Sequence, residues 1–259
     1  MQTIYSGLYA RAVSLGINIS TSGWILENTP FPHISIEQIA SVPTQDNSLV
    51  SRIEESRYQF SIHSLSFTDT QDYIELLKTN LAFGELELDY RRFTSMQYDN
   101  HMYREVSAGI YHGLITFNVL TEKDYSQNQH RIVSTRFYDG LKTINDNSLK
   151  AVMTMTEQLE NTELPYISIS NIRSTSTDAH SQGILNSDNF SFQIFDKDLF
   201  HLEETIEKVH NNYDYCLIDI QQKKNLTVQW LMNTITEIEP GIWRARMDYS
   251  AINEDLINV

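Results

Sequence analysis

The stretch LENTPFPHISI occupies residues 26–36, and a near copy, LENTELPYISI, occupies residues 159–169. Eight of their eleven positions are identical, at a constant offset of 133 residues. In both copies a proline is followed by alternating apolar and polar residues, which is the pattern of a half-buried strand. A proline is tolerated at the start of a strand because its missing N–H falls outside the ladder. The two stretches therefore predict the same strand entry twice in one chain.

The similarity continues along the chain at an offset of 132 residues. RYQFSIHS at 57–64 aligns with NFSFQIFD at 189–196, and EVSAGIYHGLITF at 105–117 aligns with EIEPGIWRARMDY at 237–249. Apolar positions stay apolar where the letters differ. Internal repeats are considered first because they decide the architecture. We therefore predict a tandem duplication of a module of about 120 residues.

Each copy has the same predicted order of elements, with LENT ending the first helix and the proline starting the first strand. Apolar residues at helical spacing predict the helices, and period-two alternation predicts the strands. The expected helices cover about 3–15, 70–79 (capped by Thr68 or Asp69) and 146–160, the first strands begin after Pro32 and Pro165, the third strands cover about 84–91 and 215–222, and the fourth strands begin at Gly109 and Gly241.

One buried and one wetter face per strand suits an antiparallel sheet with helices on one side. We therefore predict an α+β fold of two similar domains in the order α-β-β-α-β-β. Each domain has an antiparallel, about four-stranded sheet with helices packed on one face. The predicted first domain is 1–125, the linker is 126–144 and the second domain is 145–259.

The composition of the 259 residues is that of an ordinary globular protein, with 41% hydrophobic residues and a net charge of −15. No run approaches the roughly 18 to 20 apolar residues needed to cross a bilayer, and the first residues do not resemble a secretory signal. We expect a soluble, unexported protein without a membrane partner. Cys216 is the single cysteine, which excludes an intramolecular disulfide and a cysteine-based zinc site.

Motifs for nucleotide binding, zinc proteolysis and serine hydrolysis are absent from the sequence. Eight histidines are scattered without metal-ligand spacing. His63, near Asp69 and Asp72 in the sequence, could serve as a general base, or be only a partly exposed histidine of a strand. Three histidines of the first copy are replaced in the second: His63 by Phe195, His33 by Tyr166 and His112 by Arg244. We therefore predict no catalytic, cofactor or metal site, and a protein that is not an enzyme.

Six residues are candidates for contacts between subunits because they form aligned pairs in the two copies. They are Arg91 and Arg92, aligned with Lys223 and Lys224, and Tyr98, aligned with Trp230. The basic pairs could form salt bridges to an acidic neighbouring subunit, or serve only as solubilising charge at strand ends. The aromatic pair could anchor an interface, or belong to a satellite of the core.

The Pro-led P-x-I-S-I strand, the alternating second strand, the amphipathic helix and the late strand after glycine resemble tail terminator, or tail completion, proteins of long-tailed bacteriophages. Residues 28–120 and 161–252 each resemble one such domain. The resemblance implies an antiparallel sheet flanked by helices, in a protein that forms a ring on the end of the tail tube. The chain would form a trimer with pseudo-six-fold symmetry, or a hexamer.

The resemblance also implies partners and a location. The partners are tail tube and neck or connector proteins, and the location is the virion tail or neck, after assembly in the host cytoplasm. An acidic lumen would let DNA pass without binding it, because an acidic wall repels the phosphate backbone. Two alternatives remain: another assembly adaptor in the neck, sheath end or baseplate, and a two-domain enzyme with an interdomain cleft.

Overall fold

A computed structural model gives the fold. It describes residues 2–26, 28–46, 51–89, 91–124, 132–134, 151–153, 163–180, 183–214, 216–219 and 223–256. The chain divides into two compact units, each assembled from three segments. The first unit comprises Met1–Gln45, Ile53–Lys123 and Thr234–Trp243, and the second comprises Asp46–Arg52, Asp124–Asn233 and Arg244–Val259.

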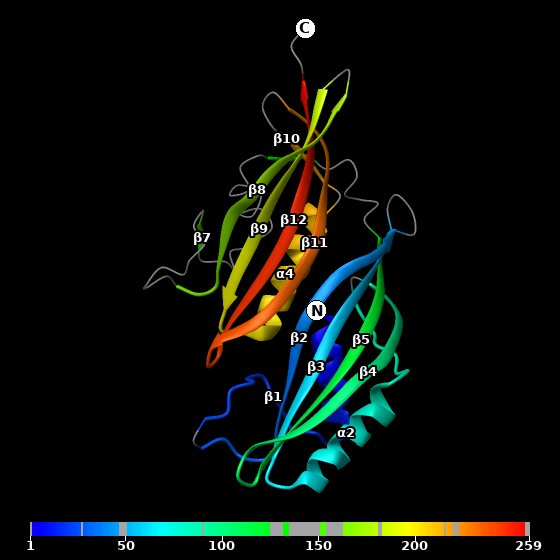
Figure 1. The fold of residues 1–259 in the computed structure, drawn as a ribbon, viewed down its shortest axis with the longest axis vertical. Coiled ribbons are helices and arrows are strands. Elements are labelled where there is room, and N and C mark those ends of the chain that lie inside the picture. The colour runs from blue at the N-terminus through cyan, green and yellow to red at the C-terminus, as the bar shows by residue number, and fades with distance from the viewer. Residues whose placement is uncertain are drawn as a thin grey trace. The chain divides into compact units, whose positions relative to one another are not determined.

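Long strands dominate the described chain (Figure 1). The elements are α1 (Ile4–Ser14), β1 (Ile19–Ser20), β2 (His33–Asp46), β3 (Ser51–Ser64), α2 (Phe67–Leu81), β4 (Arg92–Ser107), β5 (Ile110–Asp124), β6 (Ile132–Ser134), β7 (Ala151–Met153), β8 (Tyr166–His180), β9 (Gly183–Asp196), α4 (Leu199–Tyr213), β10 (Leu217–Asp219), β11 (Lys223–Glu239) and β12 (Ile242–Leu256). No helix in the described part of the chain is long and apolar enough to span a membrane.

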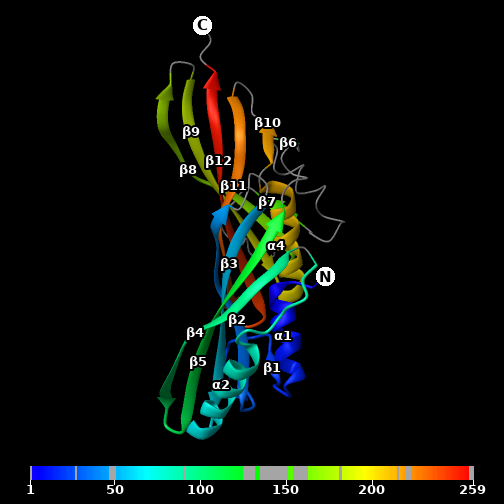
Figure 2. The ribbon, with the colours of Figure 1, turned by 90° about the vertical axis from the view of Figure 1, so that its right-hand side faces the viewer.

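In the first unit, β4, β5, β3 and β2 lie side by side, and α1 and α2 cover one face of these strands (Figure 2). The core contains Phe60 of β3, Phe117 of β5 and Ile74 of α2, all fully buried. Gly113 of β5 lets α2 approach closely, because a Cβ there would lie 2.6 Å from Thr70 and 2.8 Å from Ile74. The alternation predicted from the sequence therefore places the core as expected.

In the second unit, β11, β12, β9 and β8 are consecutive strands, and α4 covers one of their faces (Figure 2). The helix buries Leu202, Ile206 and Val209, which recur at helical spacing on one face. Phe192 and Ile194 of β9 are fully buried as well. The strands predicted after Pro32 and Pro165 and at the two glycines are confirmed.

The predicted fold class of two separate four-stranded α+β domains is wrong. The strand order β4-β5-β3-β2-β11-β12-β9-β8-β7, with β1 beside β2, places strands of both halves in one ten-stranded sheet. The physical reason lies at the edges of the predicted sheets. In separate sheets β2 and β11 would each expose a row of unpaired N–H and C=O groups, and pairing the two strands removes both edges.

The composition of the units also differs from the predicted domains 1–125 and 145–259. Residues 46–52, at the turn of the β2–β3 hairpin, belong to the second unit, and residues 234–243, at the turn of the β11–β12 hairpin, belong to the first. We call these segments the β2–β3 tip and the β11–β12 tip. Each half of the sequence therefore contributes one hairpin tip to the unit built mainly from the other half.

The third strand predicted at 84–91 is wrong, because β4 begins only at Arg92. The residues just before β4 form hydrogen bonds that do not belong to a sheet. The Asp89 N–H donates to the Gln2 carbonyl at 3.2 Å, and Arg11 Nη1 donates to the Glu85 carbonyl at 3.0 Å. In the second half, β10 within the predicted 215–222 pairs in parallel with β6, away from the main sheet. In the first half, bonds to Gln2 and Arg11 therefore take the place of the expected ladder, and in the second half a parallel pairing with β6 does so.

Helix boundaries also needed correction. The N-cap of α2 is Ser66, whose Oγ accepts from the Asp69 N–H at 3.2 Å, rather than Thr68 or Asp69 itself. The helix predicted at 146–160 contains the strand β7, which pairs with β8, and its other residues lie outside the described ones. The predicted linker, 126–144, contains the strand β6, and its other residues also lie outside the described part of the chain.

The first LENT stretch does not close a helix, because α1 already ends at Ser14. Instead it forms a turn, in which the Thr29 N–H donates to the Leu26 carbonyl at 3.0 Å and the Leu26 N–H donates to Thr29 Oγ1 at 2.7 Å. The second stretch, at 159–162, lies outside the described residues. The expected helix-closing role of LENT is therefore wrong in the copy that can be seen.

Candidate functional site

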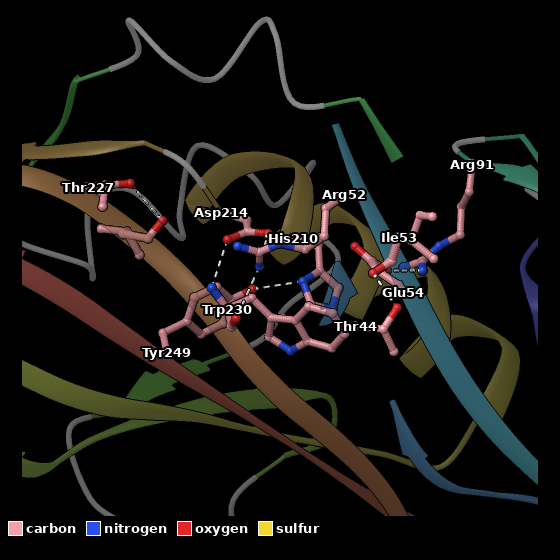
Figure 3. A network of polar contacts seen from close by, with 11 residues as sticks. Thr44, Arg52, Ile53, Glu54, Arg91, His210, Asp214, Thr227, Trp230 and Tyr249 are labelled. Carbon is pink, nitrogen blue, oxygen red and sulfur yellow. Dashed lines mark hydrogen bonds and ion pairs between the residues drawn. The ribbon is translucent and has the colours of Figure 1, made fainter. Parts of the chain in front are cut away.

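Arg91 and Arg92, predicted to meet another subunit, are both paired inside the first unit. Arg91 Nη1 donates to Oε2 of the fully buried Glu54 (Figure 3) and lies 3.4 Å from Thr121 Oγ1. Arg92 Nη2 donates to Glu122 of β5. The Arg91 side chain is 7% exposed and that of Arg92 is 77% exposed. Arg91 is thus a buried ion-pair partner, and a contact of Arg92 with another subunit stays a prediction.

The aligned aromatics Tyr98 and Trp230 have different surroundings. Trp230 is 1% exposed, and its indole packs edge-on against His210 with centroids 4.6 Å apart. It therefore belongs to the core, the alternative that the sequence left open. Tyr98 is half-buried, with Lys78 Nζ 5.3 Å from its ring centroid and its hydroxyl bonded to His101 Nδ1. Of this pair, Tyr98 is the one that a partner can reach.

Lys223 and Lys224 begin β11, and their side chains lie outside the described ones. Their role at an interface stays a prediction. The structure does not gather the six predicted residues into one site, because Arg91, Arg92 and Tyr98 lie at or on β4 in the first unit and Trp230 lies in the second.

A hollow of about 610 Å³ lies beside Tyr98 on the surface of the first unit. Its lining residues are Lys78, Thr79, Ala82, Phe83, Gln97 and Tyr98. The side chain of Phe83 is 87% exposed. We call this surface the Phe83 patch, and it combines an open cavity with an aromatic ring that projects into solvent.

A second hollow of about 660 Å³ involves the β11–β12 tip. Trp24 and Ile39 on its rim are both more than a third exposed, and two carboxylates, Glu37 and Glu237, line it. The Gly23 N–H donates to Glu237 Oε2 at 2.8 Å. Burial, and then the charge of Glu237, raise the pKa of Glu37. The hollow therefore holds two carboxylates that repel each other.

Three histidines from neighbouring strands of the first unit form a row. His33 is on β2, His63 on β3 and His112 on β5, which are consecutive in the sheet. The rings of His63 and His112 stack with centroids 4.0 Å apart and planes 9° apart, and the His33 ring lies 6.4 Å from that of His63. Arg104 of β4 pairs directly opposite His112. We call the three residues the histidine row.

Hydrogen bonds fix the protonation state of His112. Arg104 Nε donates to its Nδ1 at 3.1 Å, and because a guanidinium can only donate, Nδ1 carries no proton. Nε2 then carries the proton and donates to Ser61 Oγ at 2.8 Å. Burial, and then the charge of Arg104, lower the pKa of His112 to about 4. Burial, and then interactions with His112, His33 and Arg104, lower the pKa of His63 to about 4, so the rings of His63 and His112 are both uncharged at neutral pH.

The aligned positions of the second unit form an aromatic stack instead. Tyr166 of β8 and Phe195 of β9 are direct cross-strand partners, and their rings stack with centroids 4.6 Å apart. Burial raises the pKa of Tyr166 to about 12, and the aligned Arg244 is half-buried on β12. The same face thus carries imidazoles in the first unit and an uncharged aromatic pair in the second.

The core of the second unit contains a buried polar network that includes an arginine of the β2–β3 tip (Figure 3). Arg52 Nη1 lies 3.4 Å from Asp214 Oδ2 and donates to the Trp230 carbonyl at 3.2 Å. Asp214 Oδ1 accepts from the Trp230 N–H at 2.7 Å. His210 Nδ1 and the Tyr249 hydroxyl are 3.1 Å apart. The arginine therefore joins the tip to the core of the second unit.

Sequence reasoning missed both the histidine row and the buried network. The three histidines have no ligand spacing along the sequence, since only strand pairing brings them together. Arg52 and Asp214 are separated by 162 positions, and no local pattern marks the pair. Within the described residues, no group of three or more histidine, cysteine, aspartate or glutamate side chains could hold a metal ion.

A comparison with solved structures gives a weak likeness to a virion protein. No protein-family model and no curated protein matches the chain. Among solved structures, a chain from the virion of a native gene transfer agent (GTA) particle is similar, with a TM-score of 0.37 and 11% identity over 46% of this chain and 94% of that chain. This likeness concerns the fold alone, and its TM-score is too low to support an argument.

Proposed function

We propose that this chain is a structural virion protein, rather than an enzyme, that forms a ring at the head-proximal end of a phage tail tube or in the neck. In this role it terminates the tail and joins it to the head connector. The ring is a trimer with pseudo-six-fold symmetry or a hexamer. It assembles in the host cytoplasm and becomes part of the virion.

The observation that carries the proposal is the repetition of one arrangement of elements. The order β2-β3-α2-β4-β5 recurs as β8-β9-α4-β11-β12. The closing hairpins match in detail, because Glu105 accepts from the Gly109 N–H at 3.1 Å and Glu237 accepts from the Gly241 N–H at 2.7 Å. Two similar modules in one chain suit a closed ring, in which each patch meets a different patch on the next copy.

We also propose that DNA passes through the lumen of the ring, and the net charge supports this. A net charge of −15 makes the surface repel a phosphate backbone, so DNA passes through an acidic lumen without being held. Arg92 and Tyr98, which are accessible in the first unit, are the proposed contact residues between subunits or with tube and neck proteins.

Size-exclusion chromatography with light scattering, alone and mixed with tail tube and neck proteins, tests the proposal. In the mixtures with tail tube and neck proteins, we expect a closed oligomer of three or six chains, visible as a ring by negative-stain microscopy. A strictly monomeric species in every mixture and at every concentration would contradict it. Labelling the chain within the assembled particle then separates a terminator from a neck, sheath-end or baseplate position.

A further inference from the structure

The connection between α2 and β4 presents Phe83 in an uncommon way. The side chain is 87% exposed, and the backbone has φ of 61°, in the left-handed region that bulky residues rarely adopt. A glycine or asparagine would suit this conformation better, and the exposed ring adds nothing to the core of the unit. Such backbone outliers persist where neighbours over-determine them, and they gather at binding sites.

The surroundings of Phe83 do over-determine its backbone. Its N–H donates to the Met96 carbonyl of β4 at 3.0 Å. Arg11 brackets the turn, since Nε and Nη2 donate to the Asn80 carbonyl at 3.2 and 3.1 Å and Nη1 donates to the Glu85 carbonyl at 3.0 Å. A Cβ at Gly84 would lie 2.7 Å from the Arg11 guanidinium carbon, so glycine allows this close approach. The aromatic ring is thus displayed on a fixed backbone, which lowers the entropy lost on binding.

The hollow beside Phe83 is suited to receive another aromatic ring. It has a volume of about 610 Å³ and includes the ring of Tyr98, with Lys78 Nζ 5.3 Å from the centroid. Aromatic rings favour stacked or edge-on contact with another ring, and an ammonium group attracts the face of a ring. A projecting ring and a receptor for a ring therefore lie side by side on one surface.

We propose that two copies of this chain associate through the Phe83 patch about a two-fold axis, with the Phe83 ring of each copy seated in the hollow of the other. An isologous contact requires one surface that supplies both complementary parts, and the Phe83 patch does so. The occupant of the hollow is therefore a second copy of this chain. This inference does not depend on a role in a virion, and a ring of copies would use other surfaces as well.

The charge of the chain predicts how the proposed contact between two copies depends on salt. Each copy carries a net charge of −15, and Glu85 and Glu87, both exposed, follow Phe83 closely in the chain. Repulsion between two copies weakens at higher ionic strength, because the Debye length falls from about 10 Å at 0.1 M salt to about 3 Å at 1 M. Self-association therefore strengthens with added salt, whereas a contact with a basic partner would weaken.

Sedimentation velocity of the full chain over a range of concentrations, in about 0.05 M and about 0.5 M sodium chloride, tests the proposal. We expect a dimer that is favoured by salt and weakened about 100-fold or more by Phe83→Gly, as for loss of a central aromatic anchor. Phe83→Gly relieves the positive φ, so its melting temperature should not fall. The control Leu65→Ala removes an apolar side chain that is 63% exposed outside the patch, and it should leave the dimer unchanged.

A mixing experiment adds a second measurement. Thr79→Trp fills the hollow but leaves Phe83 in place, so it should abolish self-association as Phe83→Gly does. An equimolar mixture of the two variants restores one of the two contacts, and mixed dimers should reappear at intermediate affinity. A wild-type chain that stays monomeric at high salt, or a dimer that Phe83→Gly leaves intact, overturns the proposal. Neither result would bear on ring formation with tube or neck proteins.

Discussion

The two exchanged hairpin tips are held in different ways. The β2–β3 tip contributes Arg52, whose side chain is 4% exposed and whose Nη1 lies 3.4 Å from the fully buried side chain of Asp214 in the second unit. The β11–β12 tip contributes Glu237, whose carboxylate binds the N–H groups of Gly23 and Gly241 in the first unit, next to a second carboxylate. One tip is therefore fixed by a buried charge pair, and the other by charge-assisted bonds in a half-open hollow.

This difference shows how similar modules can carry unequal energetics. Breaking a buried ion pair leaves an uncompensated charge in a medium of low polarity, whereas a half-exposed carboxylate can recover hydration. The exchange of tips also means that neither unit is complete without residues of both sequence halves. We therefore expect the largest mutational effects at the β2–β3 tip, and smaller ones at the β11–β12 tip.

The first prediction concerns Arg52→Met. It should lower the free energy of unfolding by about 3 to 5 kcal/mol, because Asp214 then keeps a buried charge without this counter-charge. Urea unfolding followed by circular dichroism measures the change. The control Arg57→Ala, on the same strand, removes a side chain that is 47% exposed and 3.9 Å from Asp99, and should cost less than about 1 kcal/mol.

A double variant sharpens this prediction. Arg52→Met with Asp214→Asn also removes the negative charge of Asp214 but keeps an oxygen that can accept from the Trp230 N–H. It should be more stable than Arg52→Met alone, because the cost lies in the uncompensated charge. Equal instability of the single and double variants would show that the loss comes from packing, and the buried pair would not be the anchor of the tip.

The second prediction compares the hairpin turns at Gly109 and Gly241, whose φ angles are 76° and 75°. Alanine at either position must adopt a left-handed conformation, which costs about 1 to 2 kcal/mol. A Cβ would meet no atom within 4 Å at either site, so strain alone sets the cost. Thermal unfolding of Gly109→Ala and Gly241→Ala should therefore show similar losses. A much larger loss at Gly241 would mean that the β11–β12 tip depends on its turn more than its counterpart does.

The third prediction concerns the histidine row. The folded-state pKa of His63 and of His112 is about 4, below the ordinary value of 6.5, so between these values the unfolded chain binds more protons. Stability should therefore be full above about pH 6.5, fall as the pH drops towards 4, and level off below it. The slope of melting temperature against pH measures the effect. His63→Phe, which copies Phe195, should flatten the slope.

The reciprocal variant makes the comparison between the units direct. Phe195→His places an imidazole against the ring of Tyr166, in an aromatic stack that carries no charge near neutrality. It should steepen the loss of stability in the same pH window, because the buried site disfavours the protonated ring. If His63→Phe leaves the slope unchanged while Phe195→His steepens it, the row is already hydrated and does not couple to folding.

The sequence predicted the features that depend on neighbouring residues. The strands after Pro32 and Pro165 and the turns at Gly109 and Gly241 follow from alternation and backbone preference, which act over a few positions. The pairing of β2 with β11 could not be predicted in this way. It follows from the removal of two strand edges, and edges become visible only when the whole sheet is known.

The same distinction between neighbouring residues and three-dimensional arrangement applies to the candidate sites. Tyr98 aligns with Trp230 in the sequence, yet the two rings have different environments, because similar spacing along the chain does not fix burial. Phe83 could not be predicted as a site, because a single aromatic residue in a loop forms no recognisable sequence pattern. Its left-handed backbone and the bracketing by Arg11 appear only in three dimensions.

The smallest expected effect is that of Glu37→Gln. Burial and then Glu237 raise the pKa of Glu37, so the folded chain favours its protonated form, and its charge costs stability above that pKa. Glutamine should therefore raise stability at pH 7 by a few tenths of a kcal/mol, because a partly exposed charge is screened by water. Near pH 4 the gain should shrink, since Glu37 itself then takes up a proton.

Melting temperatures of wild type and Glu37→Gln at pH 7 and pH 4 measure this difference. The matched control is Glu239→Gln, which removes an exposed charge from the same β11–β12 tip and should change little at either pH. A stabilisation by Glu239→Gln as large as that by Glu37→Gln would mean that total acidity weakens the tip. A gain confined to Glu37→Gln instead assigns the repulsion to the pair Glu37 and Glu237, and so explains why this tip is held more weakly than the one anchored by Arg52.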